Sequence, residues 1–247
     1  MEKVFGLIGG TVSHSFSKAY FDEKFFREGL RDYHYELFPL SSIKEIEPLL
    51  KDTRGLSGLN VTIPYKEQVI QYIDVLDDFA RKIGAVNVIK IENGRLKGYN
   101  TDSAAFHDSV EKWLPAGEKV KAVVLGTGGS SKAVQEALNK LGIEYTLVSR
   151  KPRKGVVTYR ALAKDPAILR NSRLVVNTTP LGMSPNTESM PSIDFEHITK
   201  DHYVYDLIYN PARTLFLQKA EMRNATIKNG LEMLHIQAEK SWSIWNS

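Results

Sequence analysis

The chain has 247 residues, no cysteine, and 33 lysine and arginine residues against 29 aspartate and glutamate residues, which gives a formal net charge of +4. The lack of cysteine excludes disulfide bonds, thiolate catalysis and thiolate metal ligands, and we predict no metal site. The small net charge, the 42% hydrophobic content and the lack of an apolar run near the ~18 residues of a membrane span predict a globular cytoplasmic protein that binds neither nucleic acid nor membrane.

The first hundred residues alternate between strand-like and helix-like segments. Strands are predicted over residues 4–8, 33–38, 58–63, 85–92 and 95–99, and helices over residues 18–28 and 67–75. Ser42 and Glu45 have the spacing of a capping box, which predicts a further short helix after them. The pair Asn93-Gly94 favours a tight hairpin between the last two strands.

The rest of the chain has the pattern of parallel βαβ units. Strands are predicted over residues 121–125, 145–149, 174–177 and 203–207, and helices over residues 101–112, 132–141 and 230–245. Because strands that alternate with helices build parallel sheets, we predict an α/β fold. The first domain comprises residues 1–102 and a returning C-terminal helix, residues 230–247, and the second comprises residues 103–229.

Residues 126–131 form a glycine-rich turn between a predicted strand and a predicted helix. In such a turn, backbone N–H groups and the positive end of the helix dipole bind a pyrophosphate. Gly126 allows the tight turn and Gly128 allows a phosphate to approach, whereas Ser131 replaces the third glycine of the dinucleotide-binding pattern. This context favours a nucleotide site, and the alternative is a tight βα turn without a ligand.

The next predicted strand ends at Ser149, where a site for NAD would have an acidic residue that binds the ribose 2′-hydroxyl. Four cationic residues follow instead: Arg150, Lys151, Arg153 and Lys154. Because arginine pairs bidentately with a phosphate, we predict NADP as the cofactor. The alternative for this loop on its own is a solvated basic turn.

Polar side chains gather in the first half of the chain. Ser15 and Ser17, at positions i and i+2, can both face one anion in an extended segment, and the alternative is that Ser17 caps the following helix. Asn60 and Thr62 lie on one face of a predicted strand beside Lys66.

Three more assignments have open alternatives. Asn87 interrupts an apolar run, so it is either a structural hydrogen-bond hub or a ligand contact. If Lys66 and Asp102 meet, the carboxylate holds the ammonium while a proton passes to or from a substrate, which is what a carbonyl reduction needs. The alternatives are that Lys66 is an ordinary surface lysine and that Asp102 is the N-cap of the helix that follows it.

Several segments, in their order and combination, resemble the shikimate dehydrogenase family over nearly the whole chain. They are Ser15-Phe16-Ser17, Asn60-Val61-Thr62-Ile63-Pro64-Tyr65-Lys66, Gly84-Ala85-Val86-Asn87, Gly98-Tyr99-Asn100-Thr101-Asp102, Gly126-Thr127-Gly128-Gly129-Ser130, Asn177-Thr178-Thr179-Pro180-Leu181-Gly182-Met183, Tyr205-Asp206-Leu207-Ile208-Tyr209-Asn210-Pro211 and a last motif with Gly230, Met233, Leu234, Gln237 and Ala238.

The resemblance implies an enzyme that reduces 3-dehydroshikimate to shikimate with NADPH, in the biosynthesis of chorismate and aromatic amino acids. It implies that the first predicted domain binds substrate, that the second is a Rossmann-like NADP-binding domain, and that Lys66 and Asp102 are the catalytic pair. The matching substrate contacts are Ser15, Ser17, Thr62, Asn87, Tyr209 and Gln237. The matching cofactor contacts are Gly126, Thr127, Gly128, Gly129, Ser130, Ser149, Arg150, Lys151, Arg153, Lys154, Thr178, Thr179, Leu207 and Gly230.

The sequence departs from the family pattern at two positions. Lys18 stands where the family usually has proline, and Ser149 stands where asparagine is usual before the arginine. Three rivals stay open: an enzyme that prefers quinate and NAD, a non-catalytic sensor of the same metabolite, and an enzyme like methylene-tetrahydrofolate dehydrogenase. Monomer and homodimer are both compatible with the sequence.

Overall fold

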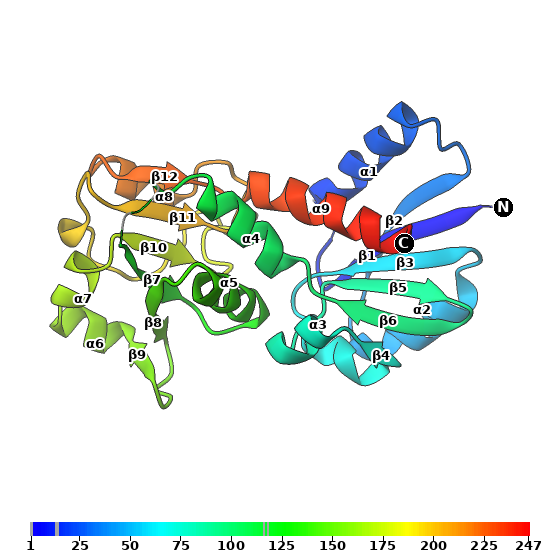
Figure 1. Ribbon diagram of the computed structural model, residues 1–247, viewed down its shortest axis with the longest axis horizontal. Helices are drawn as coiled ribbons and strands as arrows, with labels where there is room; N and C mark the ends of the chain where they lie inside the picture. The colour runs from blue at the N-terminus through cyan, green and yellow to red at the C-terminus, as the bar shows by residue number, and fades with distance from the viewer. Residues whose placement is uncertain (1, 13–14, 116, 118) are drawn as a thin grey trace. The chain divides into compact units, whose positions relative to one another are not determined.

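The computed structural model describes residues 2–12, 15–115, 117 and 119–247, and the chain divides into two compact units (Figure 1). The first unit comprises Met1–Thr101 and Ala238–Ser247, and the second comprises Asp102–Gln237. Each unit contains a six-stranded sheet with helices packed against it. The predicted α/β class is therefore confirmed.

The sheet of the first unit is mixed, with the strand order β2-β1-β3-β5-β6-β4. Its strands are β1 (Lys3–Gly9), β2 (Tyr33–Pro39), β3 (Leu56–Val61), β4 (Val75–Leu76), β5 (Val88–Glu92) and β6 (Arg95–Tyr99). β1 pairs in parallel with β2 and β3, whereas β5 pairs antiparallel with β3 and β6. Asn93 and Gly94 both have positive φ angles, 52° and 74°, so the predicted tight hairpin is confirmed.

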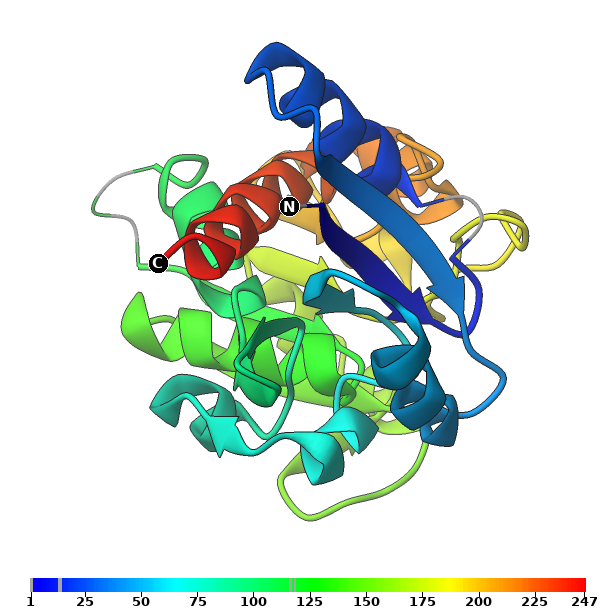
Figure 2. The same ribbon diagram turned by 90° about the vertical axis from the view of Figure 1, so that its right-hand side faces the viewer.

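Helices cover both faces of this sheet (Figure 2). They are α1 (Phe16–Arg27), α2 (Ile46–Asp52), α3 (Asp78–Ile83), the C-terminal part of α9 (Leu231–Trp245), and the 3₁₀ helices η1 (Ile43–Glu45) and η2 (Gln68–Tyr72). Successive side chains of a strand point to opposite faces. Phe5 and Leu7 of β1 accordingly pack with α1 and α9, whereas Ile8 packs with α2.

The predicted helix over residues 67–75 is wrong in type and length, because this segment forms η2 and then β4. Asp74 explains the difference. Its N–H donates to the Leu96 carbonyl at 3.0 Å, and its carboxylate accepts from the Leu96 N–H at 2.7 Å. These two bonds hold the chain at the sheet edge, where β4 pairs with β6.

The short helix predicted after Ser42 and Glu45 is confirmed as α2, which follows η1. Ser42 caps η1 by accepting from the Lys44 N–H at 3.4 Å, and Glu45 accepts from the Ser41 N–H at 3.2 Å, so α2 begins only at Ile46. The sequence analysis missed α3, although Asp77 is an ordinary N-cap that accepts from two N–H groups of its first turn.

The sheet of the second unit is parallel throughout, with the strand order β12-β11-β10-β7-β8-β9. Its strands are β7 (Lys121–Leu125), β8 (Glu144–Ser149), β9 (Val156–Thr158), β10 (Leu174–Asn177), β11 (Tyr203–Asp206) and β12 (Thr226–Lys228). Numbered within the unit, this is the 3-2-1-4-5-6 order of a Rossmann fold. The short edge strands β9 and β12 are not among the strands predicted from the sequence.

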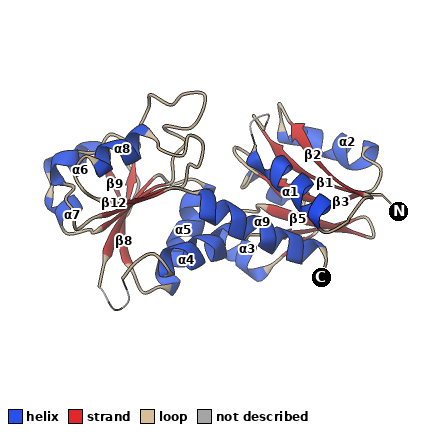
Figure 3. Ribbon diagram, turned by 90° about the horizontal axis from the view of Figure 1, so that it is seen from above, coloured by secondary structure: helices blue, strands red, loops and turns tan. Residues whose placement is uncertain are grey.

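Helices lie on both faces of the second sheet, and Figure 3 shows α6 and α8 on the side opposite α4 and α5. The helices are α4 (Asp102–Glu111), α5 (Gly129–Lys140), α6 (Tyr159–Lys164), α7 (Ala167–Arg170), α8 (Leu215–Glu221) and the 3₁₀ helix η3 (Phe195–His197). α5 begins three residues earlier than the predicted helix at residue 132. The helices α6, α7 and α8 are not among those predicted from the sequence.

The last helix, α9, contributes to both units. Met233 packs in the core of the second unit, whereas Ala238 and Trp245 pack in the core of the first. Residues 230–237, which the sequence analysis placed in the first domain, therefore lie in the second unit.

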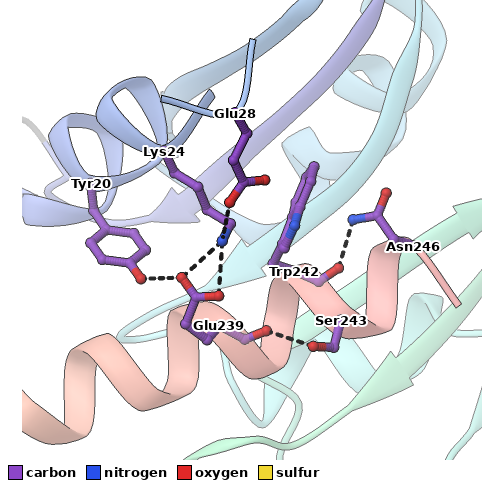
Figure 4. Close-up of polar contacts among 7 residues, drawn as sticks. All are labelled: Tyr20, Lys24, Glu28, Glu239, Trp242, Ser243 and Asn246. Carbon is purple, nitrogen blue, oxygen red and sulfur yellow. Dashed lines mark hydrogen bonds and ion pairs between the residues drawn. The ribbon is translucent and has the colours of Figure 1, made fainter. Parts of the chain in front are cut away.

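Within the first unit, a buried lysine ties α9 to α1 (Figure 4). Lys24 is 5% exposed, donates to both carboxylate oxygens of Glu239 at 3.0 and 2.9 Å, and lies 2.8 Å from Glu28. The Tyr20 hydroxyl donates to the same Glu239 carboxylate, and the Trp242 ring lies under the Lys24 ammonium. Burial favours a higher pKa for Glu239, but the hydrogen bonds from Tyr20 and Lys24 outweigh it and lower that pKa.

Candidate active site

The carboxyl ends of β1 and β3 lie side by side in the first unit. The Thr62 N–H donates to the Ile8 carbonyl at 2.9 Å, and the Gly10 N–H donates to the Ile63 carbonyl at 3.1 Å. Thr62 therefore lies beside the turn that leads from β1 toward Ser15. A pocket of about 310 Å³ at this edge of the sheet is lined by Gly10, Thr11, Val12, Leu37 and Pro39.

Ser15, and not Ser17, is the N-cap of α1. Its hydroxyl accepts from the Ser17 N–H at 3.2 Å, and its backbone is extended. The alternative that Ser17 caps the helix is therefore wrong, because α1 begins at Phe16 and Ser17 lies inside its first turn. A hydroxyl that accepts a hydrogen bond keeps its own proton to donate, so capping leaves Ser15 able to bind an anion.

Lys18, the departure next to these serines, has a structural role. Its ammonium donates to the Tyr35 carbonyl of β2 and lies 3.5 Å from Asp22 and 3.6 Å from Glu36. The side chain thereby ties the first turn of α1 to β2. A proline at this position would lack that contact.

Lys66 lies in the turn after β3, and its neighbours hold the backbone of this turn. The Tyr65 hydroxyl is buried and donates to the Leu40 carbonyl at 2.7 Å. The Lys66 carbonyl accepts from the Val86 N–H at 2.7 Å, and the Lys66 side chain is half-buried.

Asn87 is 2% exposed and binds the residue that precedes Asp102. Its amide oxygen accepts from the Thr101 N–H at 2.8 Å, and its amide nitrogen donates to the Thr101 hydroxyl at 3.0 Å. Asn87 thus has a structural role, and its role as a ligand contact stays a prediction. Since Lys66 is held by the neighbouring Val86, the segment 85–87 fixes both the Lys66 backbone and the chain that leads into Asp102.

Asp102 is the first residue of α4 and is 2% exposed. An acidic side chain in the first turn of a helix interacts favourably with the helix dipole. Two other predicted substrate residues belong to the second unit: Tyr209, in the segment after β11, and Gln237, on α9. Both are half-buried.

In the second unit, the glycine-rich turn connects β7 to α5 and has the local geometry of a dinucleotide-binding loop. Gly126 has a φ angle of +115°, and a Cβ atom there would lie 2.6 Å from the Thr178 hydroxyl, so only glycine fits. Ser131, in place of the third glycine, is buried and donates to the Gly126 carbonyl at 2.7 Å. This hydrogen bond joins the first turn of α5 to the start of the glycine-rich turn.

The start of α5 fits a bound phosphate. Gly128 is exposed, its missing side chain faces open space, and it gives α5 no side-chain cap. The first-turn N–H groups, which include those of Gly129 and Ser130, therefore have no capping side chain, and the first turn of α5 has no acidic residue. Thr127 lies in the same turn and is half-buried.

The residues after β8 fit an additional phosphate. The Gly126 N–H donates to the Val148 carbonyl at 2.8 Å, so the end of β8 lies beside the glycine-rich turn. Ser149 accepts from the Lys151 N–H at 3.3 Å. The exposed cationic residues of this loop are Arg150, Lys151, Arg153 and Lys154.

The predicted residues Thr178, Thr179 and Leu207 follow β10 and β11 at the same edge of the sheet. The Thr178 N–H donates to the Leu125 carbonyl at 2.9 Å, and the Leu207 N–H donates to the Asn177 carbonyl at 3.1 Å. Gly230 contacts this edge closely, because a Cβ atom there would lie 2.0 Å from the Leu207 carbonyl oxygen. Ligands bind at this edge of α/β sheets, where the strand order reverses.

Asn177 and Asp206, which end the buried strands β10 and β11, are not among the site residues predicted from the sequence. Both are fully buried, and the Asn177 amide donates to the Asp206 carboxylate at 3.0 Å. The Asp206 carboxylate also accepts from the Ile208 N–H at 3.1 Å and from the Thr214 hydroxyl at 2.7 Å. Burial raises the pKa of Asp206 to about 7, against the opposing effect of these hydrogen bonds.

Comparisons with a family profile, with known relatives and with solved structures all agree on one family. The profile described as the shikimate dehydrogenase substrate-binding domain matches residues 7–89. The shikimate dehydrogenase (NADP(+)) of Methanococcus aeolicus is 36% identical over 98% of this chain and 91% of its own length. That of Dehalococcoides mccartyi strain 195 is 39% identical over 100% of this chain and 91% of its own.

A solved structure agrees with these relatives. The shikimate dehydrogenase of Aquifex aeolicus has a TM-score of 0.88 with this chain at 32% identity, over 99% of this chain and 92% of its own. Within the described part of the chain, no helix has the length and apolar character to cross a membrane.

Proposed function

The chain belongs to the shikimate dehydrogenase family, and we propose that it catalyses the reversible reduction of 3-dehydroshikimate to shikimate with NADPH. What supports this most is the 39% identity to an NADP-dependent shikimate dehydrogenase over the full length of the chain. In this proposal, residues 1–102 with 230–247 supply the substrate contacts except Tyr209, and residues 103–229 supply the cofactor contacts except Gly230.

We assign the proton chemistry to Lys66 and Asp102. Bound NADPH supplies the hydride, and the carbonyl oxygen of the substrate then needs a proton. The Lys66 ammonium donates that proton, and the Asp102 carboxylate holds the ammonium in place. The hydrogen bonds of Asn87 to Thr101 and of Val86 to Lys66 support the pairing, because one segment fixes the backbone next to both residues.

The remaining polar residues bind and orient the substrate in this proposal. Ser15 and Ser17 donate to the substrate carboxylate. The ring hydroxyls and the carboxylate are further contacted by Thr62, Asn87, Tyr209 and Gln237. A substrate with one carboxylate and several hydroxyl groups needs such an array of neutral hydrogen-bonding side chains.

The local geometry of the second unit supports the proposed cofactor contacts. The pyrophosphate is bound by the backbone of Gly126, Thr127, Gly128, Gly129 and Ser130. The 2′-phosphate is bound by the loop that contains Ser149, Arg150, Lys151, Arg153 and Lys154. The nicotinamide half lies near Thr178, Thr179, Leu207 and Gly230.

The test is a comparison of substrates and cofactors with the purified protein, read at the absorbance of reduced nicotinamide. Shikimate with NADP should turn over fastest among the four combinations of shikimate or quinate with NADP or NAD. Faster turnover of quinate with NAD would assign the chain to the quinate enzymes. Binding of shikimate by calorimetry without turnover under any combination would identify a sensor and reject the proposal.

A small-molecule enzyme of this kind needs no nucleic-acid or membrane partner, and we propose that it acts in the cytoplasm as a monomer or homodimer. Light scattering during size-exclusion chromatography gives the molar mass and thereby distinguishes a monomer from a homodimer.

A further inference from the structure

Asp206 lies beneath the two segments that carry the proposed nicotinamide contacts. β10 ends at Asn177 and β11 ends at Asp206, and these two residues are direct partners in the parallel register of the two strands. Both side chains are fully buried. Two polar side chains thus meet inside the sheet edge at which a dinucleotide binds.

The Asp206 carboxylate holds its own segment at two points. One oxygen accepts from the Ile208 N–H at 3.1 Å, and the other accepts from the Thr214 hydroxyl at 2.7 Å. Thr214 in turn caps α8 by accepting from the Leu217 N–H at 3.3 Å. These bonds fix both ends of the segment that contains Leu207 and Tyr209.

The same carboxylate reaches the neighbouring segment through Asn177. The Asn177 amide nitrogen donates to Asp206 at 3.0 Å. The Asn177 amide oxygen accepts from the Thr179 N–H at 2.9 Å and from the Thr179 hydroxyl at 2.7 Å. One buried acid therefore sets the positions of Thr179 and Leu207 together.

We infer that Asp206 is a positioning residue for the nicotinamide half of NADP. This inference rests on the proposed function. The Asp206 carboxyl oxygens accept all three of these hydrogen bonds, whereas an alanine would leave three buried donors without an acceptor. The two segments would then move, and the contacts to the nicotinamide would be lost, although Asp206 itself contacts no ligand.

The test measures binding rather than turnover. NADPH is titrated into the free protein and followed by its fluorescence, and 2′-phospho-ADP-ribose, which lacks the nicotinamide, is titrated by calorimetry. Asp206→Ala should weaken NADPH about 10- to 100-fold, the loss expected from one or two hydrogen bonds to the nicotinamide, and should weaken 2′-phospho-ADP-ribose less than about 3-fold. The difference between the two ligands isolates the nicotinamide half.

Asp206→Asn keeps the test informative if the alanine variant does not fold. The amide oxygen can still accept from Asn177 and Ile208, and the amide nitrogen can donate to Thr214. Asp206→Asn should therefore bind NADPH more weakly than the wild type and more tightly than Asp206→Ala.

His202→Asn is the matched control, because His202 is a buried hub at the opposite end of β11. It is 3% exposed and its ring nitrogens contact the Thr199 N–H at 3.0 Å and the Leu169 carbonyl at 3.2 Å. His202→Asn should lower the melting temperature and leave the affinity for both ligands unchanged.

Two results would overturn the inference while the wild type binds NADPH normally. One is that the Asp206 variants bind NADPH as the wild type does, and the other is that both ligands weaken equally. If the wild type itself binds no NADPH, the proposed function fails and takes this inference with it.

Discussion

In the proposed mechanism, Lys66 supplies the proton, which is the one chemical step that the reaction demands of the protein. Hydride delivery to a ketone builds negative charge on the carbonyl oxygen, so a proton donor must lie within hydrogen-bond reach. Lys66→Ala should lower the turnover number by about 10²–10⁴-fold, the usual range for a general acid–base group. The Michaelis constant for shikimate should change much less, because the neutral binding residues stay in place.

Substitution of Asp102 tests whether Lys66 and Asp102 act as a pair. Asp102→Asn should also slow turnover, and the double variant should lose less than the product of the two single losses, because a pair that acts as a unit is not additive. The exposed Lys51→Ala is the control and should keep full activity. Near-normal turnover of Lys66→Ala with weakened binding would make Lys66 an electrostatic anchor and leave the proton to water.

Ser15 and Ser17 should separate in their effect on stability. Both Ser15→Ala and Ser17→Ala should raise the Michaelis constant for shikimate, since a hydrogen bond to a charged group contributes about 1.5–3 kcal/mol. Only Ser15→Ala removes the α1 cap, and it should also lower the free energy of unfolding by roughly 0.5–2 kcal/mol. Thermal melts and kinetics with saturating NADP measure both effects. An unchanged Michaelis constant in Ser17→Ala would remove Ser17 from the carboxylate site.

For single residues, the sequence predicts candidate site residues but not their hydrogen-bond partners. The types and spacing of Lys66, Asp102 and the paired serines point to a site without any structure. The hydrogen-bond partners of Asn87 and Asp206 cannot be predicted from residue types and spacing. Thr101 binds Asn87 across 14 positions and Asn177 binds Asp206 across 29, and only the strand pairing brings these residues together.

At the scale of elements, we propose that the loop after β8 decides the choice of cofactor. Arg150→Ala should weaken NADP about 10- to 100-fold and NAD much less, because a lost charged contact to a phosphate is worth roughly 1.5–3 kcal/mol. Kinetics with each cofactor at saturating shikimate measure the effect. The three neighbouring cationic residues reduce the loss to the extent that they share the phosphate. Equal losses for NADP and NAD would show that Arg150 does not bind the 2′-phosphate.

The elements that the sequence predicted are those with a strong local pattern. β7 is an apolar strand between polar segments, and the Asn93-Gly94 hairpin has its own turn signal, so both were found. β4, β9 and β12 have only two or three residues each, which is too few for a periodic pattern. Tertiary contacts override local propensity in residues 67–75, since Asp74 binds Leu96 at the sheet edge.

At the scale of the whole molecule, the buried Asp206 makes stability depend on pH. Its pKa is raised from 3.8 to about 7 by burial, and its hydrogen-bond partners Asn177, Thr214 and the Ile208 N–H do not titrate. The unfolded chain loses the proton more readily than the folded chain. The stability that Asp206 contributes is therefore fully present below its unfolded pKa and is lost as the pH rises through the folded pKa near 7.

Asp206→Asn removes this titration, so the variant should gain stability relative to the wild type as the pH rises. The difference in the free energy of unfolding should shift by roughly 1–3 kcal/mol in favour of the variant between pH 5 and pH 8. Urea unfolding followed by circular dichroism at several pH values measures it. Glu239→Gln is the control: the pKa of Glu239 is lowered from 4.5, so its contribution is lost only in acid and its difference from the wild type should stay constant over this range. If the difference in the free energy of unfolding between Asp206→Asn and the wild type also stayed constant, Asp206 would be ionised in the folded chain from pH 5 to pH 8. The hydrogen bonds from Asn177, Thr214 and the Ile208 N–H would then hold it in the ionised form.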